Sequence, residues 1–298
     1  MQHGHKHEHT YTPASLNRTF GIGIAVNLLF VAVEFIAGLY THSMGLLSDA
    51  GHNLSDVASL VLAMLAFRLA GVRSNRRYTY GYKKSTVLVS LLNAVILLVA
   101  VGVIVAESIG KFFHPQPVEG GVIMAVAGAG ILVNAFTAWL FRKDRARDIN
   151  IKGAYLHMAA DALVSAGVVV SGLAIVHTGR YIIDPVTGLV VAAVIVCSTW
   201  SLLQDSLRLS LDGVPRDIDR DEIRVLIRTI AEVKDVHHLH IWALSTTETA
   251  LTAHIVIPDL SRMETVKSRI KRLLHDHAVS HITLEFETGE TDCPDSSL

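Results

Sequence analysis

The sequence predicts an α-helical membrane protein with six transmembrane helices, followed by a small cytoplasmic α+β domain. Of its 298 residues, 51% are hydrophobic and only 18% are charged, and the mean hydropathy is +0.43. Soluble domains carry about 25% charged residues. From about residue 207 the composition changes to that of a soluble domain. Before that point, six stretches have the roughly 20 apolar residues that a spanning helix needs: 17–39, 47–69, 86–110, 121–141, 153–176 and 183–203.

Basic residues in the loops decide the orientation of the spans. The loops between spans two and three and between spans four and five are rich in Lys and Arg, whereas the other loops offer only Lys111 and Arg180. Loops rich in Lys and Arg stay in the cytoplasm, and an even number of spans places both termini on the same side. We therefore expect both termini in the cytoplasm. The basic residues of the two loops are Arg68, Arg73, Arg76, Arg77, Lys83, Lys84, Arg142, Lys143, Arg145, Arg147 and Lys152.

The domain after the spans shows alternating helix and strand patterns. Residues 219–233 carry apolar side chains at helical spacing, and a second helix is expected from Ser261. The segments 236–244, 250–257 and 282–288 are rich in β-branched and alternating residues, which favours strands. The order α-β-β-α-β predicts a small sheet with both helices on one face. The expected domains are a His-rich cytoplasmic tail (1–16), the six-helix membrane domain (17–206), the cytoplasmic α+β domain (207–290) and a flexible tail (291–298).

Two of the predicted spans contain the same polar pattern, H-x-x-x-D. The second span has His52 and Asp56, and the fifth has His157 and Asp161. Residues four apart lie on one face of a helix, so each helix offers an imidazole and a carboxylate in one direction. Two such helices facing each other supply four ligands, which is the number that Zn²⁺ takes in a tetrahedral site. The pattern predicts an intramembrane metal site.

The charge of this set agrees with a divalent cation. Two carboxylates with two neutral imidazoles carry −2, and an ionised carboxylate at the bilayer centre costs about 2.5–3.5 kcal/mol even on the lenient insertion scale. A bound Zn²⁺ neutralises both. The alternative is a buried polar network that only packs helices together, but the duplication of the pattern on two spans favours a metal. Asp49, one turn before His52, either gates the site or caps the helix, and both interpretations stay open.

Several segments together resemble the cation diffusion facilitator family of zinc transporters. They are LLSDAGHNLSD (46–56), RRYTYGYKK (76–84), AYLHMAAD (154–161), DPVTGL (184–189) and VHHLHIWAL (236–244). The resemblance implies a homodimer in a bacterial inner membrane that performs Zn²⁺/H⁺ antiport. It also implies that the cytoplasmic domain is a ferredoxin-like domain that binds metal and dimerises. It carries the family's intramembrane zinc ligands onto the four residues of the H-x-x-x-D patterns. A His at position 52 is similar to the zinc-selective branch.

The resemblance also implies sites outside the membrane. The family's cytoplasmic zinc ligands match His237, His254 and Glu287, so Zn²⁺ is expected both as transported substrate and as a regulatory ligand, with no organic cofactor. A second cytoplasmic site of the family does not align with the histidines of this chain, which are His275, His277 and His281. Lys84 and Asp212 match opposite charges that link the membrane and cytoplasmic parts; the alternative is two solvated charges.

Export of a divalent cation needs a driving force. With the cytoplasm about 100 mV negative, moving two charges outward costs about 4.6 kcal/mol, and the sequence has no G-x-x-x-x-G-K-[ST] segment for a nucleotide. Because histidine binds metal only when it is neutral, protons compete with Zn²⁺ for the same nitrogen. We expect export to be coupled to inward proton movement, with protons, the cation, lipid and a second copy of the chain as partners.

The N-terminal tail, the two cysteines and the net charge add less to the functional interpretation. His3, His5, His7 and His9 alternate in the N-terminal tail and either chelate metal weakly or have no necessary role. The tail has no pattern of a cleaved signal peptide, and two cysteines cannot form a disulfide framework. A net charge of −1 gives no reason to expect nucleic acid binding.

Two other classes of protein compete with a transporter. A metallo-enzyme is disfavoured, because there is no H-E-x-x-H segment and four protein ligands leave a tetrahedral zinc without an open position. The second class is a metal-responsive signalling protein with the cytoplasmic domain as its sensor. This alternative stays open, because sensing is compatible with transport. The preference among Zn²⁺, Cd²⁺, Co²⁺ and Ni²⁺ is not fixed by these ligands.

Overall fold

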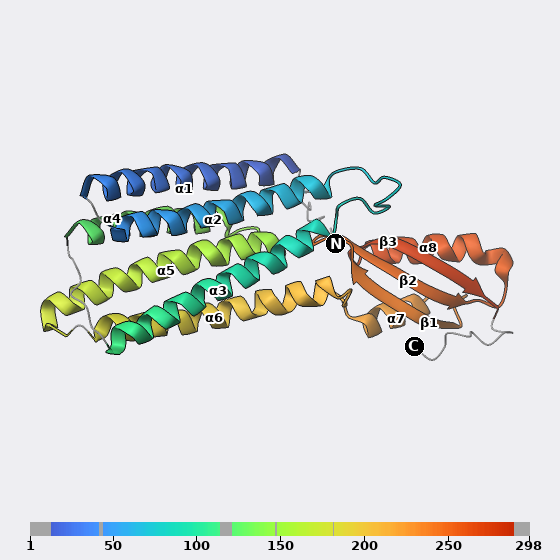
Figure 1. The fold of residues 1–298 in the computed structure, drawn as a ribbon. Helices are drawn as coiled ribbons and strands as arrows, with labels where there is room; N and C mark the ends of the chain where they lie inside the picture. The colour runs from blue at the N-terminus through green and yellow to red at the C-terminus, as the bar shows by residue number, and fades with distance from the viewer. Residues whose placement is uncertain (1–12, 42–43, 114–120, 147, 181, 289–298) are drawn as a thin grey trace, which may run out of the picture.

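Six long helices run side by side and form an elongated bundle, with a separate α/β domain at one end (Figure 1). The computed structural model describes residues 13–41, 44–113, 121–146, 148–180 and 182–288. Each of the six predicted spans lies inside one helix, so the predicted fold class is confirmed. The helices are α1 (Pro13–Thr41), α2 (Met44–Ala70), α3 (Ser85–Phe113), α4 (Gly121–Phe141), α5 (Ile149–Thr178) and α6 (Ile183–Ser210).

Three of these helices are long and apolar enough by composition to cross a membrane, as judged from the described residues. They are α1 over Arg18–Ala37, α3 over its full length and α6 over Pro185–Ser210. The described apolar part of α4, Gly128–Phe141, is shorter. The helices α2 and α5 carry the H-x-x-x-D patterns inside their predicted spans.

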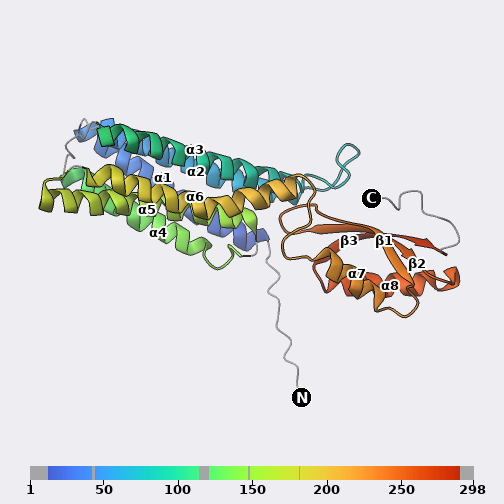
Figure 2. The ribbon, with the colours of Figure 1, turned by 90° about the horizontal axis from the view of Figure 1, so that it is seen from below.

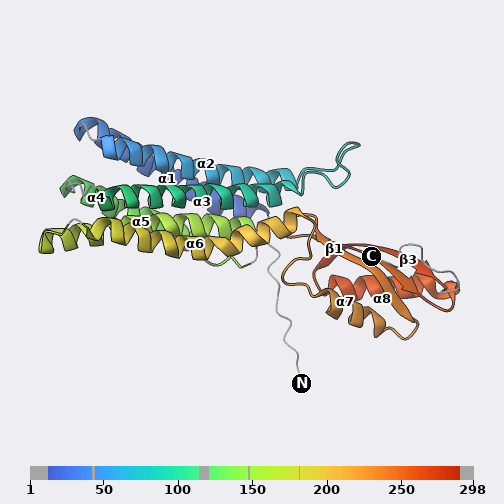
Figure 3. The same ribbon diagram turned by 60° about the horizontal axis from the view of Figure 1, so that its bottom comes forward.

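The bundle is built mainly from three helix pairs, α1 with α2, α3 with α6 and α4 with α5. Smaller contacts join α2 to α5 and α5 to α6, so α5 lies between the helix that shares its polar pattern and the helix that leads to the α/β domain. Seen from below, the bundle and the domain lie end to end (Figure 2). The α2–α3 loop and the end of α6 both reach the domain (Figure 3).

The α/β domain has the predicted order α-β-β-α-β. A three-stranded sheet runs in the order β1-β2-β3, with β1 antiparallel to β2 and β2 parallel to β3. Both helices cover one face of the sheet (Figure 2), and their apolar faces meet it in a core that includes Ile227, Leu251 and Ile270. The elements are α7 (Arg220–Arg228), β1 (Asp235–Ala243), β2 (Thr249–Val256), the 3₁₀ turn η1 (Leu260–Arg262), α8 (Met263–His275) and β3 (Val279–Glu287).

Two helix boundaries differ from the prediction. The second helix of the α/β domain was expected from Ser261, but a 3₁₀ turn comes first and α8 begins at Met263. The side chain of Asp259 accepts the backbone N–H of Ser261 in that turn. The first helix of the domain, α7, ends at Arg228 rather than continuing to residue 233. There the hydroxyl of Thr229 donates to the carbonyl of Leu226, and Ile230 and Val233 reach the core from the turn that follows.

Candidate metal centres

The polar patterns of α2 and α5 meet between the two helices. Asp56, His157 and Asp161 are all buried, and one ligand atom from each lies within 4.8 Å of the others. The Nε2 atom of His157 is 2.6 Å from Oδ1 of Asp56 and 3.9 Å from Oδ2 of Asp161. Imidazole nitrogen and carboxylate oxygen are both zinc ligands. The arrangement offers a small, dry group of three donors to a divalent cation.

The fourth predicted ligand of this group is His52, and the nearby Asp49 was considered as a gating or capping residue. His52 lies on α2 one helical turn before Asp56, but its side chain lies outside the described part of the structure, as does that of Asp49. The N-terminal histidines, His3, His5, His7 and His9, also lie outside the described residues. The geometry of the intramembrane group is therefore that of three side chains.

Sequence reasoning missed one buried carboxylate beside this group. Glu34 on α1 is 1% exposed, and its Oε2 accepts a 2.6 Å hydrogen bond from Nδ2 of Asn53, the residue after His52. An acid in an otherwise apolar span is rare and usually faces the interior of a bundle. Glu34 is the one acidic residue in the predicted first span, 17–39, and this was the signal available in the sequence. The contact ties α1 to the turn of α2 that carries the polar pattern.

A second group of potential ligands lies on the open face of the sheet. His237 on β1 and His254 on β2 are paired in the sheet register, and Glu287 ends the neighbouring strand β3. Nδ1 of His254 is 2.7 Å from Oε1 of Glu287, and Nε2 of His237 is 3.2 Å from Oε2 of the same carboxylate. All three side chains are partly buried. These donors also lie within 4.8 Å of one another.

Further polar side chains surround this cytoplasmic group. Nε2 of His254 is 3.5 Å from Oε2 of Glu285, a carboxylate that the sequence analysis did not select. A bulge in β1 gives His238 a φ of 52°, and its Nδ1 atom lies 2.9 Å from Nε2 of His240. The three histidines that did not align with a second family site lie apart from the group: among described contacts, His277 hydrogen-bonds the carbonyl of Leu273, and His281 packs against the ring of Tyr80.

The predicted pair of opposite charges at the domain boundary is in contact. Nζ of Lys84, just before α3, lies 2.5 Å from Oδ1 of Asp212, just after α6, and donates a further hydrogen bond to the carbonyl of Ala243. The adjacent Lys83 forms an ion pair with Glu248 on the turn between β1 and β2. Sequence reasoning did not predict this second pair. Both lysines join the first turn of α3 to the α/β domain.

Comparison with known proteins decides the family. Residues 21–209 match the model of the cation efflux transmembrane domain, and residues 215–288 match that of the cation efflux protein cytoplasmic domain. The chain belongs to the cation efflux family. This family is that of the cation diffusion facilitators, so the resemblance found in the sequence is confirmed. As a member of the cation efflux family, the chain is a membrane transporter of cations and not an enzyme.

Curated relatives span nearly the same length as this cation efflux protein. Zinc transporter ZitB of Escherichia coli K12 is 34% identical over 302 residues, which cover 100% of this chain and 96% of the relative. A cadmium, cobalt and zinc/H(+)-K(+) antiporter of Bacillus subtilis is 33% identical, covering 87% and 85%. The metal cation efflux system protein CzcD of Cupriavidus metallidurans is 31% identical, covering 100% and 94%.

Proposed function

We propose that the chain exports Zn²⁺, together with Cd²⁺ and other divalent transition metals, from the cytoplasm in exchange for protons. His52, Asp56, His157 and Asp161 form the transport site. The observation that carries the proposal is the convergence of Asp56, His157 and Asp161 between α2 and α5. The names of the relatives in Escherichia coli and Bacillus subtilis, which specify zinc transport and proton antiport, support the same substrate and the same exchange.

The ligand set suits a borderline cation that must be released again. Two carboxylates and two neutral imidazoles neutralise a divalent ion, so the loaded site carries no net charge within the membrane. Tetrahedral zinc takes four such ligands. The position of the donors on two different helices lets a small change in the spacing of α2 and α5 separate the two halves of the site. Such a separation provides a route to release.

Protons supply the driving force in this scheme. The nitrogen of His157 that faces Asp56 binds either a proton or the metal, so the two compete directly. A proton arriving from outside displaces the ion, and loss of that proton toward the cytoplasm makes the nitrogen available again. The inward movement of protons offsets the roughly 4.6 kcal/mol that a divalent ion requires against about 100 mV.

The cytoplasmic group serves regulation in this proposal. His237, His254 and Glu287 supply three zinc ligands, leaving one position for water or another donor. The domain that carries them also joins two copies of the chain into a homodimer. Zinc bound there reports the cytoplasmic concentration without entering the transport path.

The orientation follows from where the basic loops lie. The α2–α3 loop and the Arg145 side of the α4–α5 loop are at the end of the bundle that faces the α/β domain (Figure 3). Basic loops stay in the cytoplasm, and the matched domain model is that of a cytoplasmic domain. We place the chain in a bacterial inner membrane with both termini inside. The domain bounds are those given for the sequence.

Uptake of ⁶⁵Zn into inverted membrane vesicles tests the function. With an imposed pH gradient, acid inside, the intact chain should accumulate zinc, and collapsing the gradient should stop it. Asp161→Asn should abolish uptake, whereas Asn134→Ala, which removes a buried polar side chain of α4, should retain it. Zinc uptake that continues unchanged after the gradient is collapsed would refute the exchange mechanism.

A further inference from the structure

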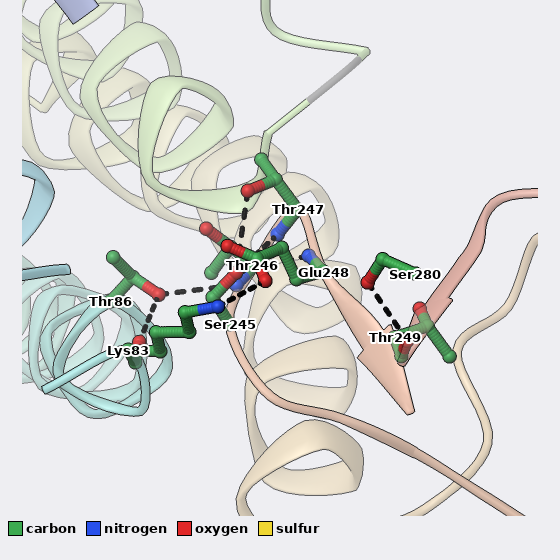
Figure 4. Close-up of polar contacts among 8 residues, drawn as sticks. All are labelled: Lys83, Thr86, Ser245, Thr246, Thr247, Glu248, Thr249 and Ser280. Carbon is green, nitrogen blue, oxygen red and sulfur yellow. Dashed lines mark hydrogen bonds and ion pairs between the residues drawn. The ribbon is translucent and has the colours of Figure 1, made fainter. Parts of the chain in front are cut away.

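The turn between β1 and β2 contacts the start of two membrane helices, α3 and α5. Figure 4 shows the side of the turn that faces Lys83 and Thr86 at the start of α3. The backbone N–H of Thr246 donates to Oγ1 of Thr86 on α3 (3.1 Å), and the Thr246 hydroxyl donates to Oδ2 of Asp148, directly before α5 (2.5 Å). The shape of the turn is fixed from within, because Oγ of Ser245 accepts the backbone N–H groups of Thr247 and Glu248. The domain therefore presents one threonine to two helices at once.

Asp148 uses its two carboxylate oxygens for two different parts of the molecule. Oδ1 accepts the backbone N–H groups of Asn150 (2.7 Å) and Ile151 (3.2 Å), which caps the first turn of α5. Oδ2 accepts the Thr246 hydroxyl. The side chain of Asn150 closes the ring by donating to the carbonyl of Thr86 at 2.9 Å. Asp148, Asn150 and Thr86 are all buried.

The rest of this boundary is more open. A cavity of about 710 Å³ lies between α5, α6 and the domain, and its lining includes Asp148 and Thr246 of this hydrogen-bonded joint as well as Lys152 and Asp205. The neighbouring ion pairs of Lys83 and Lys84 are at least partly exposed to solvent, and exposed ion pairs hold a geometry weakly. The ring of hydrogen bonds, which is buried at Thr86, Asp148 and Asn150 and partly buried at Thr246, is thus the better-defined attachment of α5 to the domain.

The joint lies in line with the transport site. His157 and Asp161 follow Asp148 by nine and thirteen residues, or about 14 and 20 Å along a helix that rises 1.5 Å per residue. A helix moves as a unit over such a length, so a shift at its first turn reaches both ligands. The opposite ends of the strands β1 and β2 carry His237 and His254.

We infer that Asp148 and Thr246 are positioning residues of the transporter: they hold the start of α5 to the cytoplasmic domain and so set the place of His157 and Asp161 relative to Asp56. The inference rests on the proposed transport function for its kinetic consequences, but not for the structural ones. Removing the Thr246 hydroxyl leaves Oδ2 of Asp148 without this donor in a buried setting. The first turn of α5 then shifts or opens.

The test uses the full-length chain in liposomes with ⁶⁵Zn on the side of the cytoplasmic domain. Thr246→Val removes the hydroxyl at similar size, Thr246→Ser keeps it, and Thr247→Val changes an exposed threonine of the same turn as a control. Thr246→Val should raise the KM for zinc by roughly three- to tenfold, within the range for residues that couple distant parts of a protein. Thr246→Ser and Thr247→Val should stay within about twofold of the unchanged chain.

Coupling between the two residues is the second measurement. Asp148→Asn should also raise KM, and the double variant Asp148→Asn/Thr246→Val should be no worse than the more severe single variant, since both break one contact. Independent effects that multiply in the double variant would overturn the inference. So would a folded Thr246→Val chain with unchanged KM.

Hydrogen exchange separates this inference from the proposed function. Backbone amides at the start of α5, residues 149–153, should exchange faster in Thr246→Val than in Thr247→Val, whether or not the chain moves zinc. Failure of the unchanged chain to transport zinc would refute the proposed function alone. Equal exchange rates of these amides in the two variants would refute the positioning role of Thr246 and Asp148 and leave the proposed function untouched.

Discussion

The Nε2 atom of His157 on α5 lies 2.6 Å from Oδ1 of Asp56 on α2, so one short contact joins the two helices that carry the H-x-x-x-D patterns. Both side chains are buried. In the absence of metal, a proton on this nitrogen can be shared with the carboxylate, and the same two atoms become ligands when an ion replaces that proton. Proton and metal thus use one location.

Removal of either partner should weaken zinc binding strongly. Loss of groups that only orient metal ligands costs about 10–100-fold in affinity, so we expect Asp56→Asn and His157→Gln each to cost at least ~100-fold. The double variant should lose less than the product of the two, because both remove ligands of one ion. Titration calorimetry on chains that also carry His237→Ala and His254→Ala measures this site by itself. Losses that multiply would contradict a shared ion.

The cytoplasmic group should bind one zinc ion separately from the transport site. His254→Ala removes a side chain that contacts both Glu285 and Glu287, so we expect the purified chain to retain one zinc ion fewer. Atomic absorption of the dialysed protein gives the count per chain. The matched control is His277→Ala, whose side chain contacts the carbonyl of Leu273 outside the group. An equal count in the two variants would rule out the cytoplasmic site.

Gly81 in the α2–α3 loop should not tolerate a side chain. Its φ is 69°, and an added Cβ would lie 2.9 Å from the carbonyl oxygen of Val72. The left-handed conformation alone costs a non-glycine residue about 1–2 kcal/mol. We expect Gly81→Ala to lower the unfolding temperature, whereas Gly71→Ala, whose Cβ would make an ordinary 3.5 Å contact, should leave it nearly unchanged. Thermal unfolding in detergent compares them, and equal temperatures would contradict this reading of the loop.

Asp148 should make stability depend on pH with a defined sign. Burial raises the pKa of this carboxyl above its ordinary value of 3.8, and hydrogen bonds from Thr246, Ile151 and Asn150 offset part of the rise. Between the ordinary and the raised pKa the folded chain holds a proton that the unfolded chain has lost, so stability falls as the pH rises through this window. The variant Asp148→Asn has no carboxyl group at this position, so its stability does not fall with pH for this reason.

The matching measurement is the difference in unfolding temperature between the unchanged chain and Asp148→Asn from about pH 4 to about pH 7. The difference should move in favour of the variant as the pH rises, because only the unchanged chain must ionise a buried carboxyl. Groups common to both proteins cancel in the difference. A difference that moves in favour of the unchanged chain would show that the hydrogen bonds outweigh burial.

Local patterns were enough to predict the fold and the approach of Asp56, His157 and Asp161 to one another. The cytoplasmic group was expected only from the resemblance to the family. The i, i+4 spacing put a His and an Asp on one face of each helix, and that rule depends only on helix geometry. The six apolar stretches and the α-β-β-α-β order likewise follow from local composition and periodicity. The helix end at Arg228 was missed because Val233 is buried and the partly buried Ile230 packs against the core after the helix stops, so the apolar pattern continues beyond the helix.

Contacts between distant, ordinary residues could not be predicted in this way. Thr246 and Asp148 are 98 positions apart, and neither belongs to a pattern that distinguishes it from other polar residues near a helix end. The pair of Glu34 and Asn53 joins two helices through one carboxylate, and nothing in the sequence selects its partner. Such contacts depend on how whole helices pack, and sequence periodicity specifies only which face of a helix is apolar.

Zinc uptake by liposomes that contain a chain with all four intramembrane side chains replaced tests the central claim most directly. The variant changes His52, Asp56, His157 and Asp161 to Ala, with folding checked by its unfolding temperature, and the comparison chain carries His237→Ala, His254→Ala and Glu287→Ala instead. We predict uptake at the level of empty liposomes for the first chain and clear uptake for the second. Uptake by the first chain at the rate of the unchanged protein would contradict the account.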